Sequence, residues 1–393
     1  MAQMGAVRDL RLVDRKGVVS ARPDLGNPQH RMLSAVVLAA GEGTRMRSER
    51  PKPLHRLCGR AMVLHVLHAL AELELDRAVL VVGHGSTRVT KAVEEEAPPG
   101  LQLDFVDQSV QRGTGDAVLV GLMALPDDDL DDSGDVVVLP GDTPLLRPPT
   151  LAALVRAHRR AGAAATVLTA RVSDPTGYGR IIRAKDGGVR RIVEQSDASE
   201  EERGLGEVNT SIYVFRRSVL APALRRLSPD NAEGEYYLTD TIAVLHDAGY
   251  PVAGVGIDDP MEAAGVNDRA QLAIAEAELR RRTNQRWMRR GVTMVDPAGT
   301  YIDVTVELAA DVTLYPGTVL RGATVVAAGA EIGPQVHLLD SRVGARSVVE
   351  ATVGRSALIG ADTRVGPWVH LPPGSVVADG VVTGAGFAAG GSA

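Results

Sequence analysis

Two glycines and two cations lie close together near the start of this 393-residue chain. In the segment Leu38-Ala39-Ala40-Gly41-Glu42-Gly43-Thr44-Arg45-Met46 the glycines let backbone N–H groups approach an anionic phosphate, and Arg45 adds a positive charge. Lys52 follows between two prolines that stiffen the chain. The segment predicts a phosphate-binding loop, although a Gly-x-Gly alone is equally consistent with a tight structural turn.

Lysine is rare in this chain, which gives Lys52 added weight. It occurs at only four positions among 43 basic residues. Lysine is a compact point charge and arginine is a planar fork, so a site that needs the former cannot substitute the latter. Lys52 is therefore a candidate for a specific role beside a phosphate.

Asp142 is a candidate ligand for a divalent cation. It stands in Pro140-Gly141-Asp142-Thr143-Pro144, directly after the apolar run 136–139. A carboxylate at the carboxyl end of a strand offers Mg²⁺ the oxygen ligand that this hard cation prefers. For so short a pattern, a turn-forming Asp that caps its own backbone is at least as well favoured.

Apolar runs and amphipathic stretches alternate over residues 34–170. The run Ser34 to Ala39 is short, continuously apolar and followed by Gly41 and Gly43, which is typical of a buried parallel strand. Further strands are expected at 78–82, 101–106, 136–139 and 164–170, with helices near 62–73 and 115–125. This order predicts an α/β domain with a mostly parallel, doubly wound sheet that binds ligands at the carboxyl ends of its strands.

The pattern changes after this region. Short strands separated by turn residues predict a β-rich insertion or lid over 178–215. Helices are expected around 236–247 and 269–290, and the second is long and charged.

An apolar residue recurs every six positions in the C-terminal part of the chain. The series is Ile302, Leu308, Leu314, Leu320, Val326, Ile332 and Leu338, after which the phase slips at Val343 and again over the interval Val348 to Val353, before Ile359, Val365, Leu371 and Val377 resume it. A small or β-branched residue stands four places after most of them, with Arg342 as the exception. The period predicts a three-sided parallel β-helix of four to five coils, and an irregular β-domain would fit so long a pattern poorly.

Composition excludes several classes of protein. Hydrophobic residues at 45% and charged residues at 23% are ordinary for a globular chain, and a net charge of −6 gives no basic footprint for nucleic acid or anionic membranes. No apolar run approaches the roughly 20 residues needed to cross a bilayer. We expect a cytoplasmic protein with small-molecule partners, in which the lone Cys58 is a free buried thiol.

Nine motifs occur in order along the chain: LAAGEGTRM, PKPLH, QRGTG, PGDTP, DPTGYGRI, IVEQ, EVNTS, GEYYLTD and GVNDR. Followed by hexapeptide repeats, they resemble the bifunctional N-acetylglucosamine-1-phosphate uridyltransferase/glucosamine-1-phosphate acetyltransferase family of bacterial cell-wall precursor synthesis, from about Leu33 to about Gly374. The resemblance implies a Rossmann-like, doubly wound nucleotidyltransferase domain followed by a short left-handed β-helix. It also implies a homotrimer.

The same resemblance implies roles for individual residues. It assigns nucleotide binding to Leu38, Ala39, Ala40, Gly41, Gln108, Gly113, Thr114 and Gly141. It assigns catalysis and charge neutralisation to Arg45, Lys52 and Asp142, and Mg²⁺ binding to Asp142 and Asn267. It assigns sugar-phosphate binding to Gly179, Glu194, Asn209 and Thr239. Gln108 would read the uracil edge, because a carboxamide offers both a donor and an acceptor. Without the resemblance, Glu194 and Asn209 would be taken for surface turn residues.

The implied reaction needs no enzyme nucleophile. A sugar-1-phosphate oxygen attacks the α-phosphorus of UTP in line and pyrophosphate leaves, so catalysis is mainly positioning and charge neutralisation. We accordingly expect His55, His65 and His68 to be structural residues.

Three positions near the implied nucleotide and metal sites depart from the family pattern. Asp116 stands where His usually follows GTG, and Pro140 replaces an aromatic or small residue before Gly-Asp. Asp268 follows Asn267 where a second Asn is common. These departures bear on substrate identity more than on reaction type.

A larger departure concerns the acetyltransferase half of the family. Pro372 stands where the family has an arginine, and no lysine follows Lys185. The resemblance also implies a β-helix with several more coils than the four to five predicted here. His337 and His370 are the only histidines of the repeats, and their places in the hexapeptides predict turns between the sides. We therefore expect no acetyltransferase site.

The expected organisation is a poorly ordered extension over 1–32, a nucleotidyltransferase domain over 33–268, a linking helix over 269–292, a β-helix over 293–385 and a tail over 386–393. The leading hypothesis is a monofunctional uridylyltransferase acting on N-acetylglucosamine 1-phosphate. One alternative is a paralogue for another sugar- or cyclitol-1-phosphate or another nucleotide. A non-catalytic trimeric scaffold is the other, and it gives no reason to keep Arg45, Lys52, Asp142 and Asn267 together.

Overall fold

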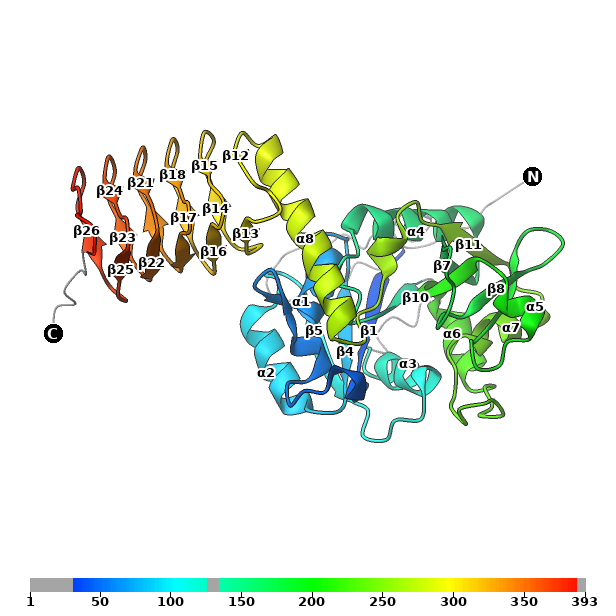
Figure 1. The fold of residues 1–393 in the computed structure, drawn as a ribbon. Coiled ribbons are helices and arrows are strands. Elements are labelled where there is room, and N and C mark those ends of the chain that lie inside the picture. The colour runs from blue at the N-terminus through cyan, green and yellow to red at the C-terminus, as the bar shows by residue number, and fades with distance from the viewer. Residues whose placement is uncertain (1–30, 126–133, 387–393) are drawn as a thin grey trace, which may run out of the picture.

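The computed structural model describes residues 31–125 and 134–386, which form an α/β domain and an elongated solenoid joined by a long helix (Figure 1). The extension expected over 1–32 and the tail expected over 386–393 lie almost entirely outside the described residues.

The main sheet runs in the order β11-β7-β10-β6-β1-β4-β5. Its strands on this path are β1 (Leu33–Ala39), β4 (Arg77–Val82), β5 (Leu103–Asp107), β6 (Asp135–Pro140), β7 (Ala165–Arg171), β10 (Glu207–Arg216) and β11 (Val252–Gly256). All neighbours are parallel except for β10, which runs antiparallel to β6 and β7, so the mostly parallel sheet is confirmed. The strands that follow β1 in the chain lie on both sides of it, which makes its carboxyl end a switch point where ligands bind.

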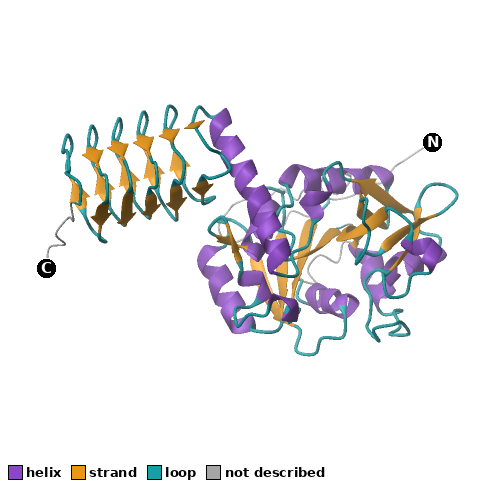
Figure 2. Ribbon diagram, in the orientation of Figure 1, coloured by secondary structure: helices purple, strands orange, loops and turns teal. Residues whose placement is uncertain are grey.

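Helices cover both faces of this sheet (Figure 2). One face carries α1 (Met62–Ala71), α2 (Ser86–Glu96) and α4 (Pro148–Ala161), and the other carries α3 (Thr114–Met123), α6 (Arg217–Leu224) and α7 (Asp240–Asp247). In β1, Val37 joins the core on the first face and Val36 the core on the second. Because both faces are covered, β1 is apolar at nearly every position.

Three helices, one strand of the main sheet and several short elements have no counterpart in the sequence prediction. In α2 only Val89 and Val93 are buried, so its apolar stripe is too narrow to stand out. The same prediction omits α4, α6 and the strand β11. The short elements are β2 (Arg56–Leu57), β3 (Arg60–Ala61), α5 (Glu200–Arg203) and the 3₁₀ helices η2 (Thr44–Met46), η3 (Lys52–Leu54) and η4 (Pro260–Ala263).

The insertion predicted over 178–215 is only partly correct. β8 (Arg180–Arg183) and β9 (Val189–Val193) form an antiparallel hairpin off the main path, but β10 lies inside the main sheet between β6 and β7. Tyr213 and Phe215 of β10 are buried and stack with 5.5 Å between ring centroids. An apolar segment does not reveal its direction or its neighbours, so sequence alone could not separate β10 from the hairpin.

The helix α8 (Arg269–Arg289) connects the two parts of the molecule and confirms the long charged helix expected there. Asp268 caps it, accepting a hydrogen bond from the backbone N–H of Gln271 at 2.8 Å. Near its start Leu272 packs against the α/β domain, and near its end Trp287 joins the solenoid core. Within residues 31–125 and 134–386, no helix is long and apolar enough to cross a bilayer.

The solenoid has three parallel sheets of five strands each, as expected for a three-sided left-handed β-helix. The first contains β12 (Thr293–Met294), β15 (Thr313–Leu314), β18 (Glu331–Ile332), β21 (Val348–Val349) and β24 (Arg364–Val365). The second contains β13 (Tyr301–Ile302), β16 (Val319–Arg321), β19 (His337–Leu339), β22 (Thr352–Arg355) and β25 (Val369–Leu371). The third contains β14 (Glu307–Leu308), β17 (Val325–Val326), β20 (Arg342–Val343), β23 (Leu358–Ile359) and β26 (Val376–Val377).

The predicted register is wrong at Val348 and Val353, but the other inward residues predicted after Leu338 are buried, from Val343 to Val377. Val353 is 53% exposed, and Gly354 takes the inward position in register with Leu338. Ser341, rather than Arg342, occupies the buried small-residue position. Inward residues are five positions apart instead of six from Leu338 to Val343 and from Val349 through Gly354 to Ile359. A difference of one residue in spacing moves a side chain to the opposite face of its strand.

His337 and His370 also differ from expectation. They lie within β19 and β25, not at turns, and their side chains are exposed. Val353 lies between them in the strand register, so the three side chains form a column on one face of the solenoid.

Successive coils of the solenoid approach each other closely at Gly344. A Cβ at this position would overlap backbone atoms of Gly360 and Ala361 in the next coil. We expect Gly344→Ala to lower the free energy of unfolding of the solenoid by about 1–3 kcal/mol, as other overpacked sites do. Gly384→Ala is the control, because a Cβ there would meet no atom within 4 Å. Equal thermal unfolding midpoints for the two variants would contradict this account.

Candidate active site

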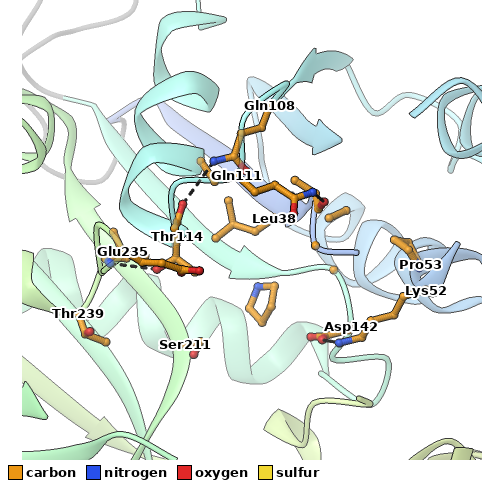
Figure 3. Close-up of a pocket in the computed structure, with 18 of the residues that line it drawn as sticks. Leu38, Lys52, Pro53, Gln108, Gln111, Thr114, Asp142, Ser211, Glu235 and Thr239 are labelled. Atoms are coloured by element: carbon orange, nitrogen blue, oxygen red, sulfur yellow. Dashed lines mark hydrogen bonds and ion pairs between the residues drawn. The ribbon is translucent and has the colours of Figure 1, made fainter. Parts of the chain in front are cut away.

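A cavity of about 350 Å³ lies at the carboxyl ends of β1 and β6 (Figure 3). Most of the predicted site residues line it: Leu38, Ala39, Ala40, Gly41, Lys52, Gln108, Gly113, Thr114, Gly141, Asp142, Glu194 and Thr239. Arg45, Gly179, Asn209 and Asn267 do not line it but contact residues that do or residues beside them. The motifs therefore converge on one place in the fold.

Positive charge gathers at one end of the cavity around Lys52. Its ammonium donates to the carboxylate of Asp142 and, at 2.8 Å, to Oδ1 of Asn267. Arg45 donates to the same Asn267 oxygen at 3.1 Å. A Cβ on Gly43 would lie 2.5 Å from the Cβ of Lys52, so only glycine lets the lysine cross this loop.

The loop after β1 is held from both sides. Gln111 donates to the carbonyl oxygen of Ala40 at 2.7 Å, and Arg269 donates to that of Met46 at 3.1 Å. A Cβ on Gly41 would meet no atom within 4 Å, so the space above this residue is open to a ligand. The arrangement agrees with close approach of an anionic group to the loop backbone.

Asp142 and Asn267 together fit a Mg²⁺ ion. Their side-chain oxygens both contact the one ammonium of Lys52, so they lie close enough to share a cation. One carboxylate and one amide oxygen, completed by water and phosphate oxygens, are a donor set that Mg²⁺ accepts. Over the described ranges no cluster of three or more His, Cys, Asp or Glu side chains could hold a metal through protein ligands alone.

The part of the cavity around Gln108 is polar, and two segments that are far apart in the sequence form it. Gln108 is 5% exposed and lies beside Gly113 and Thr114 at the start of α3. The hydroxyl of Thr114 accepts a hydrogen bond from the backbone N–H of Leu238 at 3.0 Å. A Cβ on Gly113 would come within 2.7 Å of the Tyr236 carbonyl oxygen, so the glycine permits this close packing.

Glu194 and Thr239 form the third group. Thr239 donates to Oε1 of Glu194 at 3.0 Å, and a Cβ on Gly179 would lie 3.1 Å from the other oxygen of that carboxylate. Burial raises the pKa of Glu194, and the hydrogen bond from Thr239 partly opposes that shift. A partly desolvated carboxylate beside a cavity is a suitable acceptor for ligand hydroxyls.

Asn209 does not line the cavity but contacts residues that do. Its Nδ2 donates to the Tyr213 hydroxyl at 2.8 Å, and its Oδ1 accepts from the backbone N–H of Ser211 at 3.0 Å. Tyr213 and Ser211 line the cavity themselves. The structure therefore gives Asn209 a supporting contact with two lining residues that were not predicted.

Other lining residues were also missed, including Gln111 and Glu235. Both belong to motifs quoted above, QRGTG and GEYYLTD, so the signal was present without a stated role. His55, His65 and His68 lie outside the cavity, and burial is the main cause that lowers the pKa of His65 and of His68 to about 4. Cys58 is a buried free thiol, as expected, and burial raises its pKa.

Comparison with known proteins agrees with this site. Residues 35–244 match the MobA-like NTP transferase domain. Proteins named bifunctional protein GlmU are similar over most of the chain: 48% identity in Thermobifida fusca, covering 84% of this chain and 68% of that protein, and 49% in Mycolicibacterium vanbaalenii, covering 88% and 70%. The chain belongs to the GlmU family. This membership confirms the resemblance drawn from the motifs. A third GlmU protein, from Mycobacterium bovis, is 48% identical over 88% of this chain and 70% of its own length. The chain is a nucleotidyltransferase.

Glu194 gives a test through the pH dependence of stability. Its folded pKa is raised, so the folded state loses stability as the pH rises through that value and the carboxyl ionises. Glu194→Gln stays neutral and can still accept from Thr239. We expect it to be more stable than the wild type at pH 7, by on the order of 1 kcal/mol, and equal to it near pH 4, around the unfolded glutamate pKa of about 4.3. Urea titrations at the two pH values measure this, and an equal gain at both would contradict it.

Proposed function

We propose that this chain transfers a uridylyl group from UTP to N-acetylglucosamine 1-phosphate, giving UDP-N-acetylglucosamine and pyrophosphate, with Mg²⁺ as cofactor. The observation that carries the proposal is the contact of Lys52 with Asp142 and Asn267 at one end of a cavity that also holds Gln108, at the switch point of the sheet. A triphosphate needs cations and metal ligands at one end of its site, and a base needs polar groups at the other.

In the proposed reaction a phosphate oxygen of the sugar phosphate attacks the α-phosphorus of UTP. A new P–O bond forms there, the α–β P–O bond breaks, and its electron pair leaves with pyrophosphate. Lys52 and Arg45 stabilise the negative charge that develops, and the loop after β1 supplies backbone N–H donors. A bound Mg²⁺, held by Asp142 and Asn267, would supply further neutralisation of phosphate charge.

The Glu194 and Thr239 pair is proposed to hold the sugar. A carboxylate accepts hydrogen bonds from sugar hydroxyls, and the hydroxyl of Thr239 is already oriented by that carboxylate. Gly179 leaves room because a larger residue would press on Glu194. Asn209 supports this wall through Tyr213.

We further propose a cytoplasmic homotrimer assembled through the solenoid. A short parallel β-helix has long flat faces, and a symmetric oligomer can cover them. Light scattering on the purified protein measures the mass directly, and a stable monomer at micromolar concentration would refute the trimer.

The proposed reaction is tested by measuring pyrophosphate release for UTP, CTP, ATP, GTP and dTTP against a panel of sugar- and cyclitol-1-phosphates. The fastest release with UTP and N-acetylglucosamine 1-phosphate, lost when EDTA removes the divalent metal, supports the proposal. Faster release with another sugar phosphate or with a cyclitol phosphate would identify that compound, and not N-acetylglucosamine 1-phosphate, as the substrate. No release with any pair would favour a non-catalytic scaffold.

Lys52 and Asp142 should both be needed for turnover. Removing a charge directed at a reacting phosphate costs a few kcal/mol, so Lys52→Ala and Asp142→Ala should each lower kcat by about a hundredfold or more. Lys91→Ala is the control, because Lys91 is an exposed lysine on α2. A variant that keeps near wild-type kcat would remove its residue from the mechanism.

No acetyl transfer from acetyl-CoA to glucosamine 1-phosphate is expected. That reaction needs a base for the amine and cations for the sugar phosphate. His337 and His370 share one face of the solenoid with Arg321 and Arg355, but Val353 separates the two histidines and no lysine accompanies them. Release of free CoA above a heat-treated control would overturn this expectation.

A further inference from the structure

The orientation of the Gln108 carboxamide is dictated by its neighbours. Its Nε2 donates to Oδ2 of Asp116 at 2.8 Å and is directed at the carbonyl oxygen of Gly113 at 3.4 Å. Neither a carboxylate nor a carbonyl oxygen has a proton to give. The amide nitrogen must therefore face these two groups, and the amide oxygen must face away from them.

Asp116 is itself held in place behind Gln108. It lies in the first turn of α3, is 8% exposed and does not line the cavity. Its second oxygen, Oδ1, accepts from the guanidinium of Arg112 at 2.7 Å. Each carboxylate oxygen thus has its own donor, so the carboxylate cannot rotate without losing a charge-assisted hydrogen bond.

The amide oxygen of Gln108 can accept a hydrogen bond from a ligand in the cavity. It accepts no hydrogen bond from any residue in the described ranges, and Gln108 lines the cavity. Both hydrogens of the amide nitrogen are directed at protein acceptors. Toward the cavity, Gln108 therefore acts as a hydrogen-bond acceptor, and the second, donating contact expected of a carboxamide is already used.

We propose that Asp116 is a positioning residue that turns the Gln108 oxygen toward the nucleobase and so selects a base with a ring N–H on its read edge. The inference rests on the proposed function, which places the base beside Gln108. Uracil presents an N3–H there, whereas cytosine presents a lone pair at N3 and adenine one at N1. Guanine also carries a ring N–H, so its exclusion has to depend on size.

Reversing the amide to suit cytosine is costly in this setting. The Gln108 oxygen would then meet the Asp116 carboxylate and the Gly113 carbonyl, and the hydrogen bond to a charged acceptor would be lost. Histidine, the residue usual in the family at this position, can donate or accept according to its tautomer. A carboxylate can only accept, so it leaves Gln108 a single favourable orientation.

The test is Asp116→Asn with UTP and CTP as competing substrates. Asparagine is nearly isosteric but can offer either an oxygen or an N–H, so Gln108 can reverse. We expect the UTP/CTP ratio of kcat/KM to fall by about tenfold or more, with kcat/KM for CTP rising in absolute terms. A rise in CTP turnover cannot come from general damage to the fold. Asp104→Asn is the matched control, because Asp104 lies on β5 and pairs with Arg77 outside the cavity.

A measurement on the wild type covers the case in which the variant does not fold. UTP methylated at N3 has lost the donor, so the wild type should discriminate against it at least as strongly as against CTP. Equal use of UTP and its N3-methyl derivative, or an unchanged UTP/CTP ratio in Asp116→Asn, would overturn the positioning role.

Calorimetric binding of UTP and CTP without sugar phosphate separates this inference from the proposed reaction. Preferential UTP binding without pyrophosphate release refutes the reaction and supports the base-reading inference. Turnover of UTP together with equal affinity for UTP and CTP in the wild type supports the reaction and overturns the inference.

Discussion

The contact of the Lys52 ammonium with Asp142 and Asn267 joins three segments that are far apart in the chain. It requires β1 and β6 to be neighbours, since the loop after each carries one partner, and it requires Gly43 to have no side chain where the lysine crosses. Asn267 directly precedes Asp268, the N-cap of α8, so the same contact ties the start of that helix to the cavity. The long helix in turn carries the first coil of the solenoid.

The sequence predicted the α/β domain well wherever burial on both sides of the sheet makes a strand continuously apolar, as in β1. It could not place β10, because the residues of a central antiparallel strand are as apolar as those of a parallel one. In the solenoid the six-residue period held until Leu338. Beyond it Val353 looked inward on hydrophobicity alone, and only the coil geometry shows that Gly354 takes that position.

The motifs brought side chains together around one cavity, but they did not predict the contacts between those side chains. Asn209, to which the resemblance assigned sugar-phosphate binding, does not line the cavity and contacts Tyr213 and Ser211, which do. The backbone at Ser211 has φ 61°, a left-handed conformation stabilised by the hydrogen bond from its N–H to Asn209. Such a local contact depends on a bulge in β10, where the pairing with β7 shifts register, and no spacing in the sequence encodes it.

Both ends of the cavity use acceptors to orient donors, but with different consequences for a ligand. At Gln108 the acceptors are protein groups that stay in place, so the amide oxygen remains directed at whatever enters. At Lys52 the acceptors are the same oxygens that fit a Mg²⁺ ion. An ammonium and a metal ion cannot occupy the space between those two oxygens together, since like charges repel strongly at such distances. These oxygens therefore have two possible partners, the Lys52 ammonium of this structure and the divalent cation of the proposed reaction, whereas the acceptors of Gln108 serve the protein alone.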